Sequence, residues 1–250
     1  MIIPYFTQFT SPYLTSKNTG LGNALFQIFT AYGISLKYKH SINLCNILPL
    51  INILTDWGLN HKNTIYRNII KYIMPTNNNC DTLSIHERIN YYSLYDSNLT
   101  SKIASINDNT VCSLNGYLQS FLYFDEYYND ICEKLSPDED SLLHIKNKYR
   151  HLFDKNVLNI SCHIRVNWGC NIKYDEDYKY CNDAIDYVIK HNKIEHKSII
   201  INIFSDDIEL VKQKFNLKYK QDNITIIYFQ DNFDFIDLWC MSLCNHNILS

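Results

Sequence analysis

The chain lacks the features that would place it in a membrane or on nucleic acid. Its 250 residues contain no uninterrupted apolar stretch of about 18 residues, the length that spans a bilayer. The opening MIIPYFTQFTSPY has neither the charged segment nor the apolar core of a signal peptide. The net charge is only −3 and the pI is about 6.3, so no basic field is available for nucleic acid. We therefore expect a cytoplasmic protein without a transmembrane segment or a nucleic-acid partner.

The pattern of the cysteines excludes a disulfide framework. Nine cysteines, an odd number, are scattered from Cys45 to Cys244, unlike the dense cysteines of a small secreted domain. Cys240, Cys244 and His246 have the residue types of a zinc site, but no second ligand pair with suitable spacing follows. In FDFIDLWCMSLCNHNIL the apolar residues instead alternate as helix faces do. We interpret these cysteines as core residues and expect no metal.

The second half of the chain alternates strand and helix patterns. SIIINIF at 198–204 is a continuous apolar run, typical of a strand that is covered on both faces. We expect Ser136 as a helix N-cap and Pro137 as the first helical residue, with the helix running to about residue 149. The other expected elements are strands at 157–165 and 223–230 and helices at 177–192, 207–215 and 234–246. This order predicts an α/β fold with a parallel sheet.

The first half is less regular. A strand near residues 2–9, a glycine loop and a helix over about 23–38 begin a β-α-β unit. Residues 55–110 are polar and Asn-rich, and we expect an irregular insertion there. VCSLNGYLQSFLYF at 111–124 then predicts a strand, a turn and the start of a helix. With 46% hydrophobic residues the chain can bury a large core, and we expect two domains, 1–135 and 136–250.

Glycine is scarce, with six residues in all, so the pair in NTGLGNALFQIF is a candidate ligand loop. Gly20 and Gly22 stand between an expected strand and an expected helix, with Asn23 at the helix start. Glycines allow positive φ and close backbone approach, and a helix N-terminus presents free N–H groups to an anion. The spacing is not that of a dinucleotide fold, because the third glycine is missing. A plain turn and a phosphate loop both fit this stretch.

Two further segments follow expected strands of the second half. His163 and Arg165 stand at the end of one strand, where ligands bind in open α/β sheets and where a guanidinium can hold a pyrophosphate. An ion pair with a local carboxylate such as Asp206 is the alternative for Arg165. Ser205, Asp206 and Asp207 in IFSDD end the next strand. Their oxygens suit hydrogen bonds to a sugar or base, helix capping, or both.

These segments together resemble one family, the α-1,2-fucosyltransferases of glycosyltransferase family 11. GLGNALFQIF is similar to that family's Gly-Leu-Gly-Asn-Gln-Met-Phe-Gln, and LNGYLQS to its Gly-Tyr-Phe-Gln-Ser. CHIR resembles the start of its His-x-Arg-Arg-x-Asp motif, and IFSDD its Phe-Ser-Asp-Asp. DYKYCNDAIDYVI and DLWCMSLCNHNIL also resemble family stretches. The six similarities follow the family's order from residue 20 to residue 249.

The resemblance implies a fold and a reaction. Two Rossmann-like domains of the GT-B type would face a cleft, with GDP-fucose held mainly by the C-terminal domain and the acceptor by the N-terminal one. Fucose would pass with inversion to a sugar hydroxyl, typically the 2-OH of galactose, in protein glycosylation or other carbohydrate metabolism. No cofactor and no obligatory metal are implied, and the partners are a sugar nucleotide and a glycan. Nothing in the sequence identifies a general base.

The resemblance also assigns roles to individual residues. Arg165 would neutralise the GDP pyrophosphate as it leaves, which stabilises charge that develops in the transition state. His163 would lie beside it. The donor-binding residues implied by the matched motifs are Gly20, Gly22 and Asn23 on the N-terminal side, and Arg165, Ser205, Asp206 and Asp207 on the C-terminal side.

The chain departs from the family pattern at two places. Val166 and Trp168 replace the second Arg and the Asp of the His-x-Arg-Arg-x-Asp motif. Each lost charge-assisted contact is worth about 1.5–3 kcal/mol. The chain ends at Ser250, where the family continues into a Ser-rich, Trp-containing segment, so we expect a truncated C-terminal domain. The leading hypothesis is a fucosyltransferase. The alternatives are a catalytically degenerate relative that acts as a glycan-binding, nucleotide-binding or structural protein, and a transferase for another sugar nucleotide.

Overall fold

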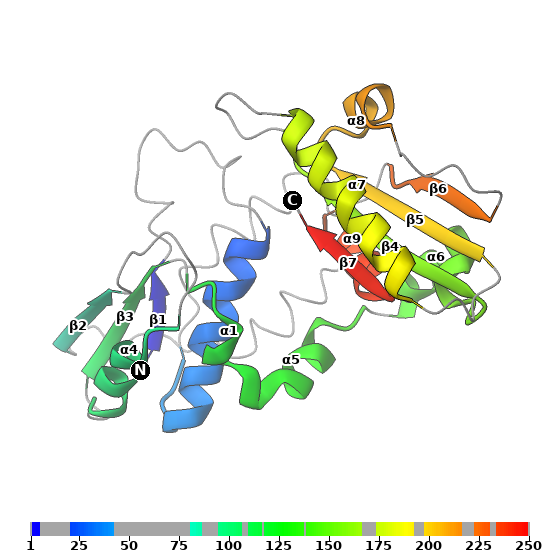
Figure 1. The fold of residues 1–250 in the computed structure, drawn as a ribbon. Helices are drawn as coiled ribbons and strands as arrows, with labels where there is room; N and C mark the ends of the chain where they lie inside the picture. Colours follow the sequence, from blue (N-terminus) through cyan, green and yellow to red (C-terminus); the bar gives the residue numbers. More distant parts are fainter. Residues whose placement is uncertain are drawn as a thin grey trace. The chain divides into compact units, whose positions relative to one another are not determined.

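The chain divides into two compact units, unit 1 (Met1–Ser136) and unit 2 (Pro137–Ser250), which are described separately here (Figure 1). In each unit, helices flank a parallel sheet, so the predicted α/β class is confirmed. The computed structural model describes residues 2–5, 21–42, 81–86, 95–106, 110–116, 118–137, 139–166, 174–192, 198–216, 223–230 and 234–249. None of the helices in these ranges is both long enough and apolar enough to cross a membrane.

Unit 1 is built on a three-stranded parallel sheet. Its order is β1 (Ile2–Tyr5), β3 (Thr110–Asn115) and β2 (Asp81–His86), so β3 is central and pairs with both neighbours. β2 and α4 (Ser97–Ala104) lie within the stretch 55–110 that the sequence suggests is irregular. The sequence did not predict these two elements, because β2 is only six residues long and α4 is a mainly polar helix, capped by Asp96.

Helix α1 (Leu21–Tyr38) holds the turn that follows β3. The amide of Gln27 donates to the carbonyl of Gly116 at 2.7 Å, and the hydroxyl of Thr30 donates to the carbonyl of Leu118 at 3.2 Å. Both side chains are buried. Gly116 has a φ of 145° and Leu118 a φ of 52°, so the turn places two residues in the left-handed region. The two buried hydrogen bonds help to maintain this backbone conformation.

Gly33 lets α1 approach the chain beyond that turn very closely. A Cβ atom built on Gly33 would lie 2.7 Å from Cβ and 2.9 Å from Cα of Phe124. These distances are shorter than van der Waals contact, and the second atom belongs to the backbone, which cannot move as a flexible side chain does. Gly33 is therefore required by packing. By contrast, a Cβ atom on Gly22, in the first turn of the same helix, would meet nothing within 4 Å.

We expect Gly33→Ala to lower the free energy of unfolding by about 1–3 kcal/mol, the usual cost of overpacking. The matched variant Gly22→Ala should leave it unchanged or raise it by up to about 1 kcal/mol, because alanine favours a helix and has room there. Urea denaturation followed by circular dichroism measures both. Equal effects of the two variants would contradict the packing role of Gly33.

Unit 2 contains a four-stranded parallel sheet. Its order is β6 (Ile224–Tyr228), β5 (Ser198–Ser205), β4 (Val157–Ile164) and β7 (His246–Leu249). The chain passes from β4 through α7 (Tyr174–His191) to β5 and through α8 (Ile208–Lys214) to β6. It then returns through α9 (Asp234–Ser242) to β7, on the other side of β4. The strand order therefore reverses between β4 and β7, as it does in Rossmann-like folds.

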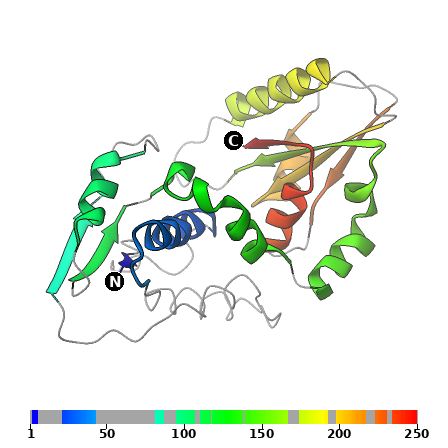
Figure 2. The same cartoon turned by 90° about the horizontal axis from the view of Figure 1, so that it is seen from below.

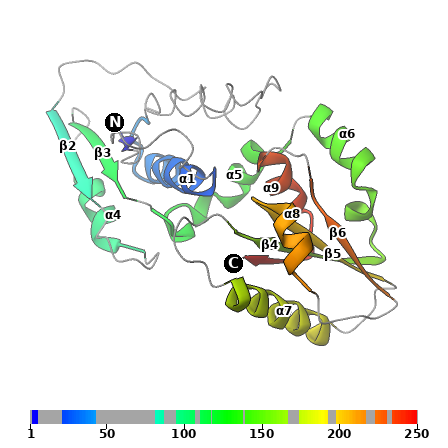
Figure 3. The same cartoon turned by 90° about the horizontal axis from the view of Figure 1, so that it is seen from above.

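Helices cover both faces of this sheet (Figures 2 and 3). α7 packs on one face, whereas α9 and α6 (Glu139–Lys148) lie together on the other. The α7 face is apolar, and Cys162 and Cys181 are fully buried there between β4 and α7. The buried residues of this core are Leu158, Ile160, Cys162, Ile164, Val166, Tyr178, Cys181, Ile185, Ile189, Ile199, Ile201, Ile203, Val211, Phe215 and Ile248.

The predicted elements of the second half are confirmed except at its beginning and its end. Ser136 is the C-cap of α5 (Tyr128–Leu135) and not the N-cap of the next helix, and α6 begins at Glu139, two residues after Pro137. The expected helix 234–246 stops at Ser242, and residues 246–249 form β7 instead. The apolar spacing extends beyond the true helix because Cys244 is buried in the turn after it. Cys240 and Cys244 are both in the core, as the sequence suggests, and burial is the main cause that raises the pKa of each thiol to about 12.

Polar contacts fix β7 against β4. Ser161 donates to the side-chain oxygen of Asn247 at 2.5 Å. The backbone N–H of Asn159 donates to the side-chain oxygen of Asn245 at 2.8 Å, and the N–H of Asn245 donates to the carbonyl of Asn159 at 2.8 Å. Because these partners are specific residues, β7 cannot slide along β4 by one position without losing them.

The face of the sheet opposite α7 carries a buried polar network around Asn202 of β5. The side-chain oxygen of Asn202 lies 2.8 Å from Nε2 of His151. The amide nitrogen of Asn202 donates to the side-chain oxygen of Asn159 at 3.2 Å and lies 3.6 Å from Sγ of Cys244. Burial lowers the pKa of His151, while the hydrogen bond with Asn202 opposes this effect. The neutral imidazole is therefore favoured in the folded protein.

The stability of unit 2 should fall as the pH drops below 6.5, the ordinary pKa of histidine. The folded state holds His151 neutral, so the unfolded state binds more protons in this range and acid favours unfolding. Urea denaturation at a series of pH values, compared with His151→Gln, measures this contribution. His151→Gln should have a shallower pH dependence, whereas the control His144→Gln, at an exposed position on α6, should keep the wild-type profile. The same profile in wild type and His151→Gln would contradict this role of His151.

Candidate active site

The candidate site of unit 2 lies at the carboxyl edge of its sheet. β4 ends at Ile164, which pairs with Ser205, the last residue of β5. Arg165 and Asp206 are therefore the next residues on two neighbouring strands. In open α/β sheets, ligands bind outside the carboxyl ends of the strands, at the point where the strand order reverses. The edge that carries Arg165 borders this point, since β4 lies between β5 and β7.

His163 belongs to β4, and Arg165 directly follows the last residue of this strand, Ile164. Ile164 belongs to the core on the α7 face, and successive side chains of a strand alternate, so His163 faces the other way. Arg165 is exposed and His163 is partly buried. The structure thus places the two predicted catalytic residues at the same carboxyl edge of the sheet, with the cation accessible to solvent.

Asp206 ties the ends of β4 and β5 together. Its Oδ1 accepts the backbone N–H of Val166 at 2.7 Å. This hydrogen bond holds the residue that directly follows Arg165, and Val166 is itself almost fully buried. The backbone on which Arg165 sits is therefore fixed from both sides. The structure gives Asp206 this positioning role, which the sequence did not indicate.

Ser205 and Asp207 form the cap of α8. Asp207 is the N-cap residue, and its Oδ1 accepts the backbone N–H of Leu210 at 3.0 Å. The hydroxyl oxygen of Ser205 accepts the backbone N–H of Asp207 at 3.1 Å. Helix capping, one of the roles that the sequence allowed for IFSDD, is thus confirmed for Asp207. The binding of a sugar or base by these residues stays a prediction.

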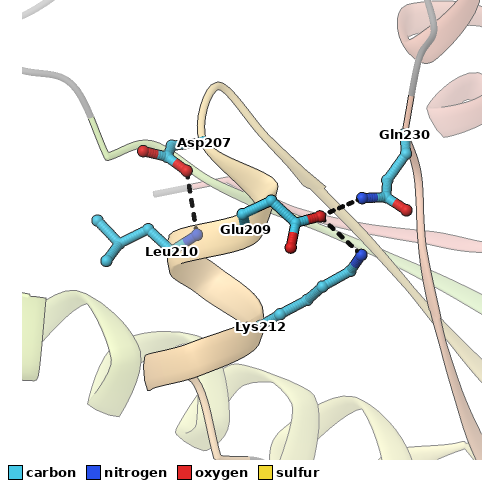
Figure 4. Close-up of polar contacts among 5 residues, drawn as sticks. All are labelled: Asp207, Glu209, Leu210, Lys212 and Gln230. Atoms are coloured by element: carbon cyan, nitrogen blue, oxygen red, sulfur yellow. Dashed lines mark hydrogen bonds and ion pairs between the residues drawn. The ribbon is translucent and has the colours of Figure 1, made fainter.

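A second set of polar contacts lies at the first turn of α8 (Figure 4). Glu209 accepts hydrogen bonds from Lys212 at 2.9 Å and from the amide of Gln230, which follows β6. Glu209 and Lys212 are on the surface, where such an ion pair contributes at most about 1 kcal/mol. These contacts connect the beginning of α8 to the chain beyond β6. No motif in the sequence predicts them.

Asp206→Ala should lower the free energy of unfolding by about 1–3 kcal/mol, because the buried N–H of Val166 loses its acceptor. Asp206→Asn keeps a side-chain oxygen and should lose clearly less. Urea denaturation of both variants tests this difference. Equal losses would mean that the negative charge of Asp206, and not its hydrogen bond to Val166, is what the fold needs.

The structure places the N-terminal candidates in unit 1. Gly20 lies outside the described residues. Gly22 and Asn23 belong to the first turn of α1, which begins at Leu21, two residues earlier than expected. Gly22 is exposed and has neither a positive φ nor a close neighbour, so neither property of glycine explains it in the structure. His163 and Arg165 belong to unit 2.

The sequence did not indicate the backbone of the turn at Gly116–Leu118. The strand and the turn that VCSLNGYLQSFLYF predicts are present, but the left-handed conformation of Leu118, just beyond the carboxyl end of the central strand of unit 1, was not predicted. Glycine at 116 was the available signal for an unusual turn. A left-handed leucine has no sequence signal, because Leu118 adopts this conformation only with its side chain fully buried and its carbonyl bound by Thr30.

Within the described residues, no three His, Cys, Asp or Glu side chains come together as metal ligands would. In comparisons with known proteins, no family model matches the chain, and no curated protein is similar enough in sequence to count as a match. The resemblance to the α-1,2-fucosyltransferases therefore remains a prediction that rests on the quoted motifs.

Proposed function

We propose that the protein is a glycosyltransferase that moves fucose, with inversion, from GDP-fucose to a galactoside hydroxyl in an α-1,2 linkage. The observation that carries the proposal is the position of His163 and Arg165 at the carboxyl end of β4, beside the reversal of strand order. This is where a Rossmann-like sheet binds a nucleotide. The presence of two units, each with a parallel sheet, supports a GT-B arrangement.

Arg165 has the chemistry that a departing GDP requires. The reaction breaks the bond between fucose C1 and a phosphate oxygen, forms a bond from C1 to the acceptor oxygen and releases the proton of that acceptor hydroxyl to a base or to water. Negative charge therefore grows on the pyrophosphate. A guanidinium holds such a group through two parallel hydrogen bonds and stabilises this charge. The hydrogen bond between Val166 and Asp206 fixes the backbone that directly follows Arg165.

One observation favours a second candidate, a degenerate relative that binds the nucleotide or a glycan without transferring sugar. Val166 stands where the family motif has its second Arg. Its side chain is 1% exposed and belongs to the core between β4 and α7. The chain thus has an apolar core residue at a position where the family would supply a second charge. Nucleotide binding through Arg165 is shared by the transferase and by a degenerate relative of the nucleotide-binding kind, and transfer belongs only to the first.

Isothermal titration calorimetry with GDP tests the shared part of the proposal. The wild type should bind GDP, and Arg165→Ala should weaken binding by about ten- to a hundredfold, the value of one or two charge-assisted hydrogen bonds. The matched control Arg150→Ala removes an exposed arginine that precedes β4 and should change little. Absence of GDP binding at millimolar ligand would overturn the proposal.

Release of GDP from GDP-fucose over a panel of galactosides separates the two candidates. Release that depends on the acceptor supports the transferase. An intact fold that binds GDP but releases none with any galactoside supports the degenerate relative. Competition by other nucleotide sugars would show whether the site prefers a different donor.

A further inference from the structure

Leu249 presents an exposed apolar side chain beside the candidate site. It is the last residue of β7, and it pairs in register with His163 of β4. Paired residues of neighbouring parallel strands place their side chains on the same face, so Leu249 shares the face of His163. Its side chain is 61% exposed. A single exposed leucine is an ordinary surface feature. Leu249 is of interest because it lies beside the candidate site.

Exposure rises along this row of side chains from β5 to β7. Phe204, which pairs with His163 from β5, is only 1% exposed. The ring of Phe229 covers it at a centroid distance of 4.2 Å, and Tyr149 stacks on Phe229 at 4.1 Å. His163 in the middle of the row is partly buried. Aromatic rings therefore close the β5 side, and a ligand beside His163 has its open surface on the β7 side.

The position of Leu249 is fixed by the contacts of β7 with β4. The hydrogen bond of Ser161 with Asn247 and the two bonds between Asn159 and Asn245 set the register. Leu249 pairs with His163, two residues before Arg165, and neighbouring strands lie about 4.8 Å apart with a rise of about 3.3 Å per residue, so an extended chain through Arg165 would place the two Cα atoms about 8 Å apart. A pyrophosphate bound by Arg165 would thus bring its attached sugar within reach of Leu249.

We propose that Leu249 contacts the C6 methyl group of fucose and makes the site selective for a 6-deoxy sugar. This inference rests on the proposed function, because it takes Arg165 as the pyrophosphate ligand. Fucose differs from L-galactose only in lacking the hydroxyl group on C6. A methyl group gains free energy when it is buried against leucine, whereas a hydroxyl group in the same place loses its hydrogen bonds to water.

Calorimetry with GDP-L-fucose, GDP-L-galactose and GDP tests this assignment. The wild type should bind GDP-L-fucose about fourfold more tightly than GDP-L-galactose, the factor expected from burying one methyl group. Leu249→Ser should bring the two affinities together and leave the Kd for GDP unchanged. The matched control Leu143→Ser replaces a 57% exposed leucine of α6 and should keep the wild-type preference.

The outcomes distinguish this inference from the proposed function. Equal affinities in the wild type, or a preference that survives in Leu249→Ser, would overturn the assignment while GDP binding leaves the proposed function standing. An equal loss of preference in Leu143→Ser would also overturn it, because the effect would not be specific to Leu249. A wild type that does not bind GDP would overturn both.

Discussion

The pairing of β7 with β4 is the constraint on which the architecture of unit 2 depends. Without β7, the sheet would run in one direction only, from β4 to β6, and would have no point at which the strand order reverses. The pairing is specified by polar side chains. Ser161 and Asn247 meet across the strands, and Asn245 exchanges two hydrogen bonds with Asn159. Asn159 and Ser161 are buried, whereas Asn245 and Asn247 are exposed, so losing either exposed partner would leave a buried polar group of β4 without its hydrogen bond.

Much of this fold could be predicted from the sequence, and the exceptions have physical causes. SIIINIF and the stripe of α7 signal their elements because burial dictates their apolar spacing. β7 was missed because its HNIL is short and polar at its start, and because only tertiary partners make a strand of it. α4 was missed in a polar, Asn-rich stretch, although its capping Asp96 was a usable signal.

The residue types of the candidate site could be predicted from the sequence, but the structural role of Asp206 could not. Motif order located His163, Arg165 and the IFSDD segment at the ends of two expected strands. The sequence did not reveal that Asp206 holds the backbone next to Arg165, because its partner is the N–H of Val166, a group that every residue except proline carries. Backbone partners leave no trace in residue identity, and such roles become visible only in three dimensions.

The topology of unit 1 also affects how the protein can form during synthesis. β1 has no strand neighbour except β3 in the described sheet, and Ile2 pairs with Cys112. On the ribosome, the first residues must therefore wait until more than a hundred later residues have been added and have left the exit tunnel. Until then the edges of β1 are unpaired, a state in which strands are prone to associate with other chains. In unit 1, β1 can reach its final place only after β3 has been synthesised.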